Sequence, residues 1–303
     1  SGSLTKSGSN TLTLSATNSY EGTTTISEGA VSITNTSGLG NASTGTTVLD
    51  GAALELSGGI TIGAEALTLN GSGISNGGAL RNILGNNSYA GLITQASNSR
   101  INSDSGTLTL NVATGNAITG TYNLTFGGAG NITVADPIAT STGTLTKDGS
   151  GTLTLSGINT YTGSTTISGG QLNINAESGL GANPGTFVAD QLIFNGGTIF
   201  NANGASISFN ANRGVTLTGN GIIKVNNAST ITIPGVITGS GSLTLAETLL
   251  GTLTLSATNT YTGQTIISSG GTLFITNVNG LGNSSTGTTV SNNAMLKISG
   301  GIT

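Results

Sequence analysis

Three stretches of the chain repeat one another and decide the fold. Thr152–Tyr161 reads TLTLSGINTY, Thr11–Tyr20 reads TLTLSATNSY and Thr252–Tyr261 reads TLTLSATNTY. Each continues into a strand rich in Thr and Ile, then a Gly-Leu-Gly turn, then a short strand that ends in Val. Apolar residues alternate with Thr in these strands, which places Leu and Ile on one face and Thr on the other. Self-similarity of this kind is typical of repeat architectures.

The spacing of the copies predicts a β-solenoid. The intervals from Tyr20 to Tyr161 and from Tyr161 to Tyr261 are both near whole multiples of about 20 residues, as expected for seven and five coils. Gly-Gly and Asn-Gly pairs supply corners with positive φ, and Asn at repeated corners is expected to satisfy backbone groups of neighbouring coils. We therefore expect an all-β, single-stranded parallel β-helix with about 20 residues per coil and about 15 coils, ~70 Å long.

Composition excludes most other classes of protein. Gly, Thr, Ser and Asn make up 173 of the 303 residues, and charged residues only 6%. There is no Cys, His or Trp, which excludes disulfide scaffolds, Cys or His zinc sites and His-based catalytic triads. Seven basic residues and a net charge of −4 argue against nucleic acid as a partner. No apolar run approaches the length that a helix needs to cross a membrane, so no helical span is expected.

The two ends of the chain also resemble each other. Thr11–Thr61 and Thr252–Thr303 align over 51 positions with 34 identities. We therefore expect residues 1–303 to form one continuous solenoid excerpted from a longer array, with homologous copies beginning near residues 3, 144 and 242. Self-association, end to end or within that longer array, is the expected partnership, because an uncovered sheet edge pairs readily with another strand.

The repeated pattern GTLTLSG-NTYTG-TTISGG-L with its Gly-Leu-Gly turn resembles the autotransporter-associated β-strand repeat of bacterial surface and secreted proteins. The best copy is Leu145–Leu172, and Asn76–Gly106 and Leu124–Asp148 look like the segments between such repeats. The resemblance implies a right-handed parallel β-helix that is exported through the outer membrane as the passenger of a larger protein. It thus implies an extracellular or cell-surface location.

The acidic residues do not form a catalytic pattern. Many parallel β-helices act on glycans, and such sites need grouped carboxylates. The isolated acidic residues mostly stand beside Gly, Pro or Ala: Asp50, Asp136, Asp148 and Asp190. Glu21 and Glu28 flank one strand, but hydroxyl residues or Gly replace them in the other copies. Lys147 beside Asp148 is interpreted as a turn pair. We therefore predict no catalytic and no cofactor-binding residues, and no enzyme activity.

Metal and ice binding find little support in the sequence. Gly127–Asn131 comes nearest to the calcium nonapeptide of other β-helices but lacks its Asp, so we predict no metal. Flat arrays of Thr can bind ice, and Thr-x-Thr pairs recur here. An ice-binding face needs such pairs in consecutive coils, whereas the sequence spaces them unevenly: Thr11/Thr13, Thr107/Thr109, Thr152/Thr154, Thr216/Thr218 and Thr252/Thr254.

The function expected from these patterns is a non-catalytic structural module, a rigid stalk, fibre or adhesin shaft. The alternative is an adhesin surface that binds carbohydrate or a host surface through Tyr20, Tyr161 and Tyr261, although an aromatic in a repeated motif more often packs a corner. A glycan-active enzyme and an ice-binding solenoid rank below both.

Overall fold

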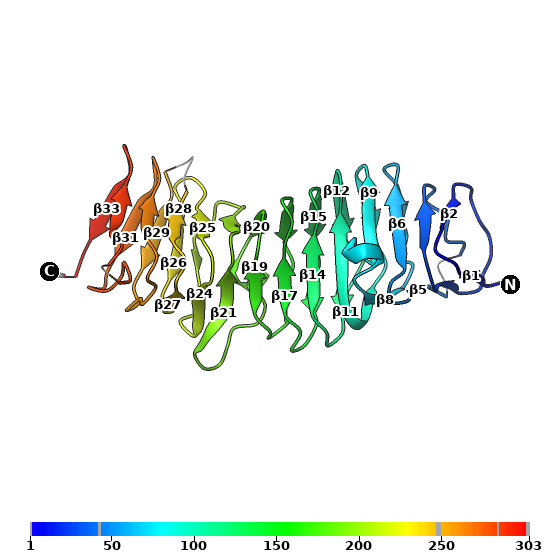
Figure 1. Cartoon of the computed structure of the whole chain (residues 1–303), viewed down its shortest axis with the longest axis horizontal. Helices are drawn as coiled ribbons and strands as arrows, with labels where there is room; N and C mark the ends of the chain where they lie inside the picture. The colour runs from blue at the N-terminus through cyan, green and yellow to red at the C-terminus, as the bar shows by residue number, and fades with distance from the viewer. Residues whose placement is uncertain (1, 42–43, 247–249, 284, 301–303) are drawn as a thin grey trace. The chain divides into compact units, whose positions relative to one another are not determined.

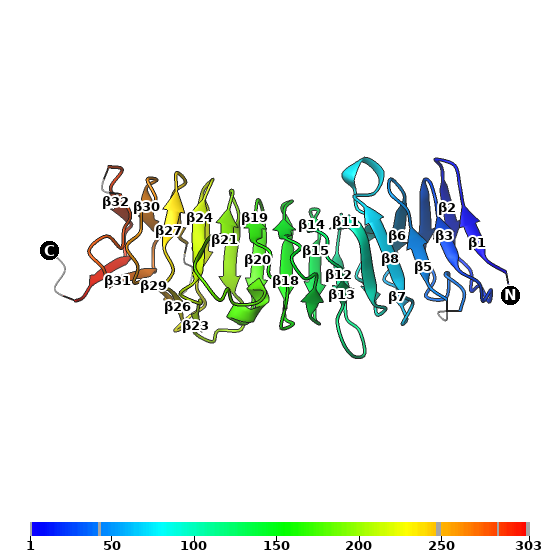
Figure 2. The ribbon, with the colours of Figure 1, turned by 90° about the horizontal axis from the view of Figure 1, so that it is seen from below.

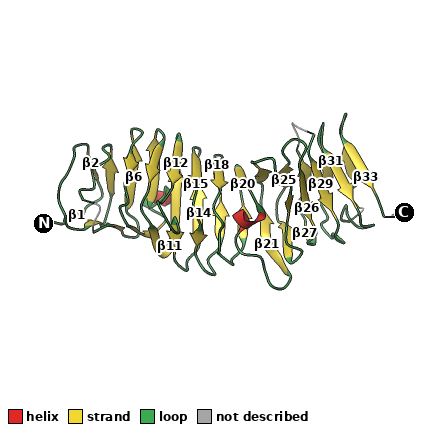
Figure 3. Ribbon diagram, turned by 180° about the vertical axis from the view of Figure 1, so that it is seen from behind, coloured by secondary structure: helices red, strands yellow, loops and turns green. Residues whose placement is uncertain are grey.

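The computed structural model describes residues 2–41, 44–246, 250–283 and 285–300. The chain divides into two compact units, Ser1–Tyr161 and Thr162–Thr303. In both units the strands are short and pair in parallel ladders, as in the stacked turns of a solenoid (Figures 1 and 2). Among these described residues, two short 3-10 segments interrupt the strands and are red in Figure 3. The predicted parallel β-helix is confirmed.

Unit 1 stacks its strands in three columns, in which each strand pairs with the equivalent strand of the next turn. The first column is β1 (Leu4–Lys6), β3 (Thr24–Ile26), β5 (Thr46–Val48), β8 (Leu67–Gly71), β11 (Ile93–Ser103), β13 (Ile118–Thr119) and β16 (Ile138–Ala139). The second is β2 (Thr11–Leu14), β4 (Ala30–Ile33), β6 (Ala53–Ser57), β9 (Leu80–Leu84), the end of β11, β14 (Leu124–Gly127) and β17 (Leu145–Lys147). The third is β7 (Thr61–Ile62), β10 (Asn87–Tyr89), β12 (Thr107–Leu110), β15 (Asn131–Val134) and β18 (Thr152–Leu155). The 3-10 segment η1 (Ile74–Asn76) follows β8.

Unit 2 is built in the same way from three columns of its own. One is β19 (Thr165–Ile167), β21 (Val188–Phe194), β24 (Arg213–Leu217) and β27 (Ile237–Gly239). Another is β20 (Gln171–Ile174), β22 (Thr198–Asn201), β25 (Gly221–Lys224), β28 (Leu243–Leu245), β30 (Thr265–Ile267) and β32 (Thr288–Val290). The last is β23 (Ile207–Ser208), β26 (Thr230–Ile233), β29 (Thr252–Leu255), β31 (Thr272–Ile275) and β33 (Met295–Ile298). The 3-10 segment η2 (Glu177–Leu180) follows β20.

The interior of each unit is a stack of aliphatic side chains. In β18, Leu153 and Leu155 are at most 1% exposed, while the Thr residues beside them face outward. Burying one such side chain stabilises the fold by about 1.5–3 kcal/mol, and each turn repeats the gain. The predicted alternation of inward apolar residues and outward Thr is therefore confirmed.

The predicted period needs a correction. The turns average about 22 residues rather than 20, which gives about 13 turns rather than 15. Within unit 1 the turn length varies: the turn that leads from Leu4 to its partner Thr24 is shorter than the turn from Leu67 to Ile93. Loops at the corners absorb the difference, because they lie on the surface and tolerate insertions.

The repeat copies also do not return to the same face. Leu4–Lys6 lies in the first column of unit 1, whereas the equivalent Leu145–Lys147 lies in the second column. Likewise Thr11–Leu14 lies in the second column and Thr152–Leu155 in the third. The interval between these copies is therefore six turns and about one further face, and the inference of a whole number of coils is wrong.

Corner asparagines satisfy backbone groups of the neighbouring turn, as predicted. The side-chain oxygen of Asn131 accepts a hydrogen bond from the backbone N–H of Thr152 at 3.0 Å, and Asn86 accepts one from Thr107 at the same distance. Asn131 is the last residue of the stretch that came nearest to a calcium motif. Its side chain binds the backbone of the next turn at a corner. A backbone N–H that has no ladder partner at a corner needs another acceptor, and these Asn side chains supply it.

Candidate functional site

The three tyrosines singled out from the sequence pack against the fold. Tyr161 and Tyr261 are fully buried, and Tyr20 is half-buried. Two of their hydroxyl groups bond to the protein itself: that of Tyr261 lies 2.5 Å from the Thr265 hydroxyl, and that of Tyr20 lies 2.7 Å from the Thr24 hydroxyl. Burial raises the pKa of Tyr261. A recognition role for these aromatics therefore conflicts with their geometry.

Lysines close two equivalent turns of unit 1. Lys6 is 8% exposed, and its Nζ donates to the carbonyl oxygens of Ser7, Gly8 and Glu28. Lys147, 3% exposed, donates in the same way to the carbonyl oxygens of Asp148 and Gly149. Burial lowers the pKa of Lys147 to about 8.

The turn closed by Lys147 needs glycine at its tip. Gly149 has φ +69°, and a Cβ there would overlap the backbone of Gly128. Lys147 therefore fills a turn, as the sequence indicated. It does so by binding the main-chain carbonyl groups of that turn.

Asp148 pairs with an arginine two turns earlier. Both Nη atoms of Arg100 lie 2.7 Å from the Asp148 carboxylate, a two-pronged ion pair. Gly127 lies on the turn between them, and a Cβ there would overlap both charged groups. Arg100 also donates to the side-chain oxygen of Asn102 at 3.2 Å. The interpretation of Asp148 as an isolated turn residue is thus wrong.

A second arginine joins the same face of unit 1. Arg81 lies 2.6 Å from Asp104 and 3.5 Å from Glu55, and the side chain of Asn102 donates to Asp104 at 2.7 Å. Burial raises the pKa of Glu55, while Arg81 acts in the opposite direction. The Glu55–Arg81 pair could have been predicted from the sequence, because the two residues are about one turn apart. The structure pairs them directly in register.

The other acidic residues named from the sequence are not gathered into a site. Glu21 and Glu28 are exposed at their corner, and Asp190 is exposed on β21. Asp136 accepts a hydrogen bond from the backbone N–H of Val112 at 2.8 Å. Within residues 2–41, 44–246, 250–283 and 285–300, no three acidic, His or Cys residues lie close enough to hold a metal ion.

One carboxyl group of unit 1 is buried without a cation. Glu65, 3% exposed, accepts a hydrogen bond from the Thr46 hydroxyl at 2.8 Å through Oε1. Neither its Oε2 nor the hydroxyl of the buried Tyr89 has a hydrogen-bond partner in the described part of the chain. Burial raises the pKa of Glu65, against the effect of the Thr46 hydrogen bond. Burial also raises the pKa of Tyr89, and the nearby Glu65 adds to that rise.

Outward Thr residues form short ladders. In unit 1, Thr109, Thr133 and Thr154 lie side by side on three consecutive turns, but the parallel position between Thr107 and Thr152 is Asn131. In unit 2, two Thr-x-Thr rows in β26 and β29 are followed by Phe274 in β31. The pairs Thr107/Thr109 and Thr152/Thr154 thus share one column, two turns apart, and Asn131 interrupts one of the two rows between them.

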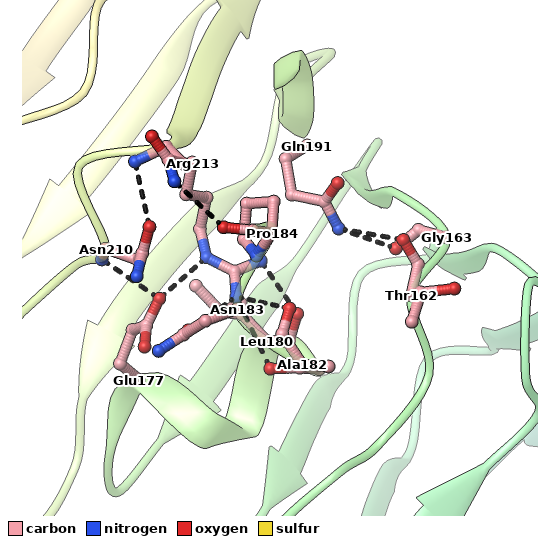
Figure 4. Close-up of polar contacts among 12 residues, drawn as sticks. Thr162, Gly163, Glu177, Leu180, Ala182, Asn183, Pro184, Gln191, Asn210 and Arg213 are labelled. Carbon is pink, nitrogen blue, oxygen red and sulfur yellow. Dashed lines mark hydrogen bonds and ion pairs between the residues drawn. The ribbon is translucent and has the colours of Figure 1, made fainter. Parts of the chain in front are cut away.

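A buried arginine holds a long loop of unit 2 (Figure 4). Arg213 is fully buried at the start of β24, and its Nε lies 2.8 Å from the Glu177 carboxylate at the start of η2. Its Nη atoms donate to the carbonyl oxygens of Leu180, Gly181 and Ala182 and to the side chain of Asn183. These donors are directed at the protein's own loop, so the cluster is a structural clamp.

Unit 1 carries a polar groove of about 860 Å³ beside the Arg100–Asp148 pair. We call it the groove throughout. Its walls are Ser, Thr, Asn, Asp and Arg side chains from β8, β11, β14 and β17 and their loops: Asp50, Gly71, Ser72, Asn76, Ser97, Asn98, Ser99, Arg100, Asn123, Thr125, Thr144, Thr146 and Asp148. A smaller hollow of about 590 Å³ lies in unit 2 near Asn259 and Gly282. Asp50, which looked isolated in the sequence, lines the groove.

The chain matches a known family in three segments. The family model described as passenger-associated-transport-repeat matches residues 4–33, 145–174 and 250–275. The adhesin BmaC autotransporter of Brucella suis biovar 1 (strain 1330) is 34% identical over 176 residues, which is 56% of this chain and 5% of that protein. The chain thus spans a small fraction of this relative's length. No solved structure matches significantly.

Each matched segment contains one of the three TLTLS stretches read from the sequence. The family resemblance drawn from the TLTLSG-NTYTG pattern is confirmed. Among the described residues no helix has the length and apolar character needed to cross a membrane. On these matches the chain is similar, over three segments, to the passenger-associated-transport-repeat family and to part of an autotransporter adhesin.

Proposed function

We propose that the chain is a non-catalytic shaft segment of a bacterial surface or secreted protein, a rigid section of an adhesin passenger. The single observation that carries the proposal is the parallel pairing of strands from turn to turn within each unit. Successive turns hydrogen-bond to one another and bury their aliphatic residues between them. A stack of this kind resists bending because an interior turn cannot open without breaking two sets of ladder hydrogen bonds.

The similarity to a known protein supports the proposed location and the proposed structural role. The similar relative is named as an autotransporter adhesin, which favours a surface or secreted location and a structural or adhesive role. The acidic residues support the absence of catalysis. Asp148 and Glu177 are held by arginines, and Asp136 binds a backbone amide, which leaves no matched pair of free carboxyl groups among them.

The test of the shaft is a distance distribution between the two units. The chain has no Cys, so Ser105→Cys and Ser269→Cys, both at exposed positions, can carry a pair of spin labels. A rigid shaft gives one narrow distance distribution by pulsed electron spin resonance, unchanged by added glycerol or salt. Two labels both placed in unit 1, at Ser105 and Asn41, provide the width expected for a rigid body. A distribution between the units much wider than this control would refute the shaft.

A further inference from the structure

The groove is lined mostly by residues outside the matched repeats, and Thr146 and Asp148 are the two exceptions. Two consecutive turns of unit 1 are longer than its other turns, those that lead from Leu67 to Ile93 and from Ile93 to Ile118. The extra residues form η1 and a bulge in β11, where the step from Gln95 to Ser99 lies opposite the shorter step from Leu69 to Gly71. Bulges redirect side chains and are frequent beside functional sites.

The wall formed by η1 is held in an uncommon backbone conformation. Ser75 and Asn76 have φ of 51° and 60°, in the left-handed region that non-glycine residues rarely adopt. The Ser72 hydroxyl donates to the Asn76 side chain at 2.6 Å and secures the turn. Strained residues of this kind persist where surrounding contacts fix them, and they cluster at binding sites. The longer turns therefore differ from the repeat in conformation as well as in length.

The groove offers both hydrogen-bond donors and hydrogen-bond acceptors. The side-chain oxygens of Asn98 and Asn123 accept hydrogen bonds from the backbone N–H groups of Asn123 and Thr144, both at 3.0 Å. These contacts fix the amide groups and leave their NH₂ donors available to a ligand. The hydroxyls of Thr125 and Thr146 stand side by side on β14 and β17, and in the described structure neither has a protein partner. The groove thus offers fixed amide donors and adaptable hydroxyls over several turns.

The charges of the groove disfavour an anionic ligand. Arg100 is already neutralised by the two-pronged contact with Asp148, and Asp50 adds one further negative charge. The four strands beneath the groove, β8, β11, β14 and β17, span roughly 14 Å along the stack at ~4.8 Å per turn. Amide donors beside hydroxyl groups suit the hydroxyl groups of neutral sugar rings, which both donate and accept hydrogen bonds.

We propose that the groove of unit 1 binds a short neutral oligosaccharide through the Asn98 and Asn123 amides and the Thr125 and Thr146 hydroxyls. The Arg100–Asp148 ion pair stabilises the strands beneath the groove, and it does not bind a charged group of the ligand. This role goes beyond the shaft: it concerns a side surface of one unit, and it can hold or fail whatever the stiffness of the chain.

The test uses the whole chain on a printed array of neutral, sialylated and sulfated oligosaccharides, followed by titration calorimetry with the best neutral member. Thr125→Ala combined with Thr146→Ala removes two hydroxyls from outward positions that contribute little to folding. Because two hydrogen bonds are lost, we expect binding about tenfold weaker or more. The matched control is Thr133→Ala, at an outward position of β15 in another column, which should leave affinity within about twofold. Equal thermal midpoints for the three proteins establish that the fold is kept.

Three results would overturn the proposal. One is an array with no neutral glycan bound above background. Another is binding restricted to sialylated or sulfated members, which the charge of the groove opposes. The last is affinity unchanged by the paired Thr substitutions, or lowered as much by Thr133→Ala. In each of these cases the spin-label experiment still tests the proposed shaft function independently.

Discussion

The clamp around Arg213 allows a quantitative test of what holds the long loop of unit 2. Replacing Arg213 by Met keeps much of the side-chain volume and removes every donor. The Glu177 carboxylate, 14% exposed, then loses its cation, and the carbonyl oxygens of Leu180, Gly181 and Ala182 lose a hydrogen-bond donor. Breaking a buried ion pair by removing one partner costs about 3–5 kcal/mol, because the other charge stays buried and unpaired.

The assay is amide hydrogen exchange in η2 and the residues after it. The N–H groups of Gly179 and Gly181 bond to the carbonyl oxygens of Ala176 and Ser178, so they report opening of this loop directly. A loss of about 3–5 kcal/mol predicts exchange faster by roughly two to four orders of magnitude. The local readout avoids a global free energy, which is poorly defined for a chain of two compact units.

A matched control and an intermediate variant sharpen the test. Lys224→Met removes a partly exposed cation of the same unit that bonds to Gln171 at 3.2 Å, and it should change exchange by less than about tenfold. Arg213→Lys keeps the charge and loses the planar fork, so it should fall between the two. Exchange in Arg213→Met within tenfold of the unaltered protein would refute the view that this arginine holds the loop.

Three further predictions concern unit 1 and the core. Glu65→Gln should stabilise the protein at neutral pH. The pKa of Glu65 is raised in the folded state, so the unfolded state loses this proton first as the pH rises through about 4.5. The contribution of Glu65 to stability is therefore complete below that pH and is lost above it. The difference in urea midpoint between variant and unaltered protein should grow from pH 4 to pH 7, and a constant difference would contradict the assignment. Gly127→Ala should displace the Arg100–Asp148 pair with little loss of stability, because the overlapping atoms are side-chain ends; NMR should show the Arg100 guanidinium protons exchanging faster, and unaltered signals would count against it. Leu172→Ala, at a fully buried position of β20, should destabilise unit 2 by about 2–5 kcal/mol as measured by amide exchange in β20 and its partner β22, and a loss below about 1 kcal/mol would show a poorly packed core.

The alternation within strands could be read from sequence because it depends on neighbouring residues only. Leu153 and Leu155 are interior and Thr154 is outward in any parallel stack, whatever lies beside them. The period could not be read as accurately. It depends on corner loops, and the extra residues between Leu67 and Ile93 leave the strand pattern on either side intact. An average taken from repeat spacing therefore hides both the turn length and the change of face between copies.

The candidate site was harder to predict than the fold for a related reason. Apart from Thr146 and Asp148, the residues that line the groove lie outside the matched repeats, so no second copy shows which of them matter. Arg100 and Asp148 are far apart in sequence, and only the register of β11, β14 and β17 brings them together. Tyr161 and Tyr261 recur at equivalent positions of the repeat, which suggested a binding role. Both are fully buried, so they recur because they pack the interior.

The placement of the basic residues determines how trypsin would act on the folded chain. That protease needs Lys or Arg in an accessible, extended segment, and Lys6, Lys147 and Arg213 are buried with their charged groups bonded to main-chain carbonyls. Arg81, Arg100 and Lys224 are partly covered and bonded to neighbouring side chains. Lys297 on β33 is the exposed one of the seven. Limited digestion should therefore trim the chain after Lys297 and leave the rest intact, since each other cut requires local unfolding first.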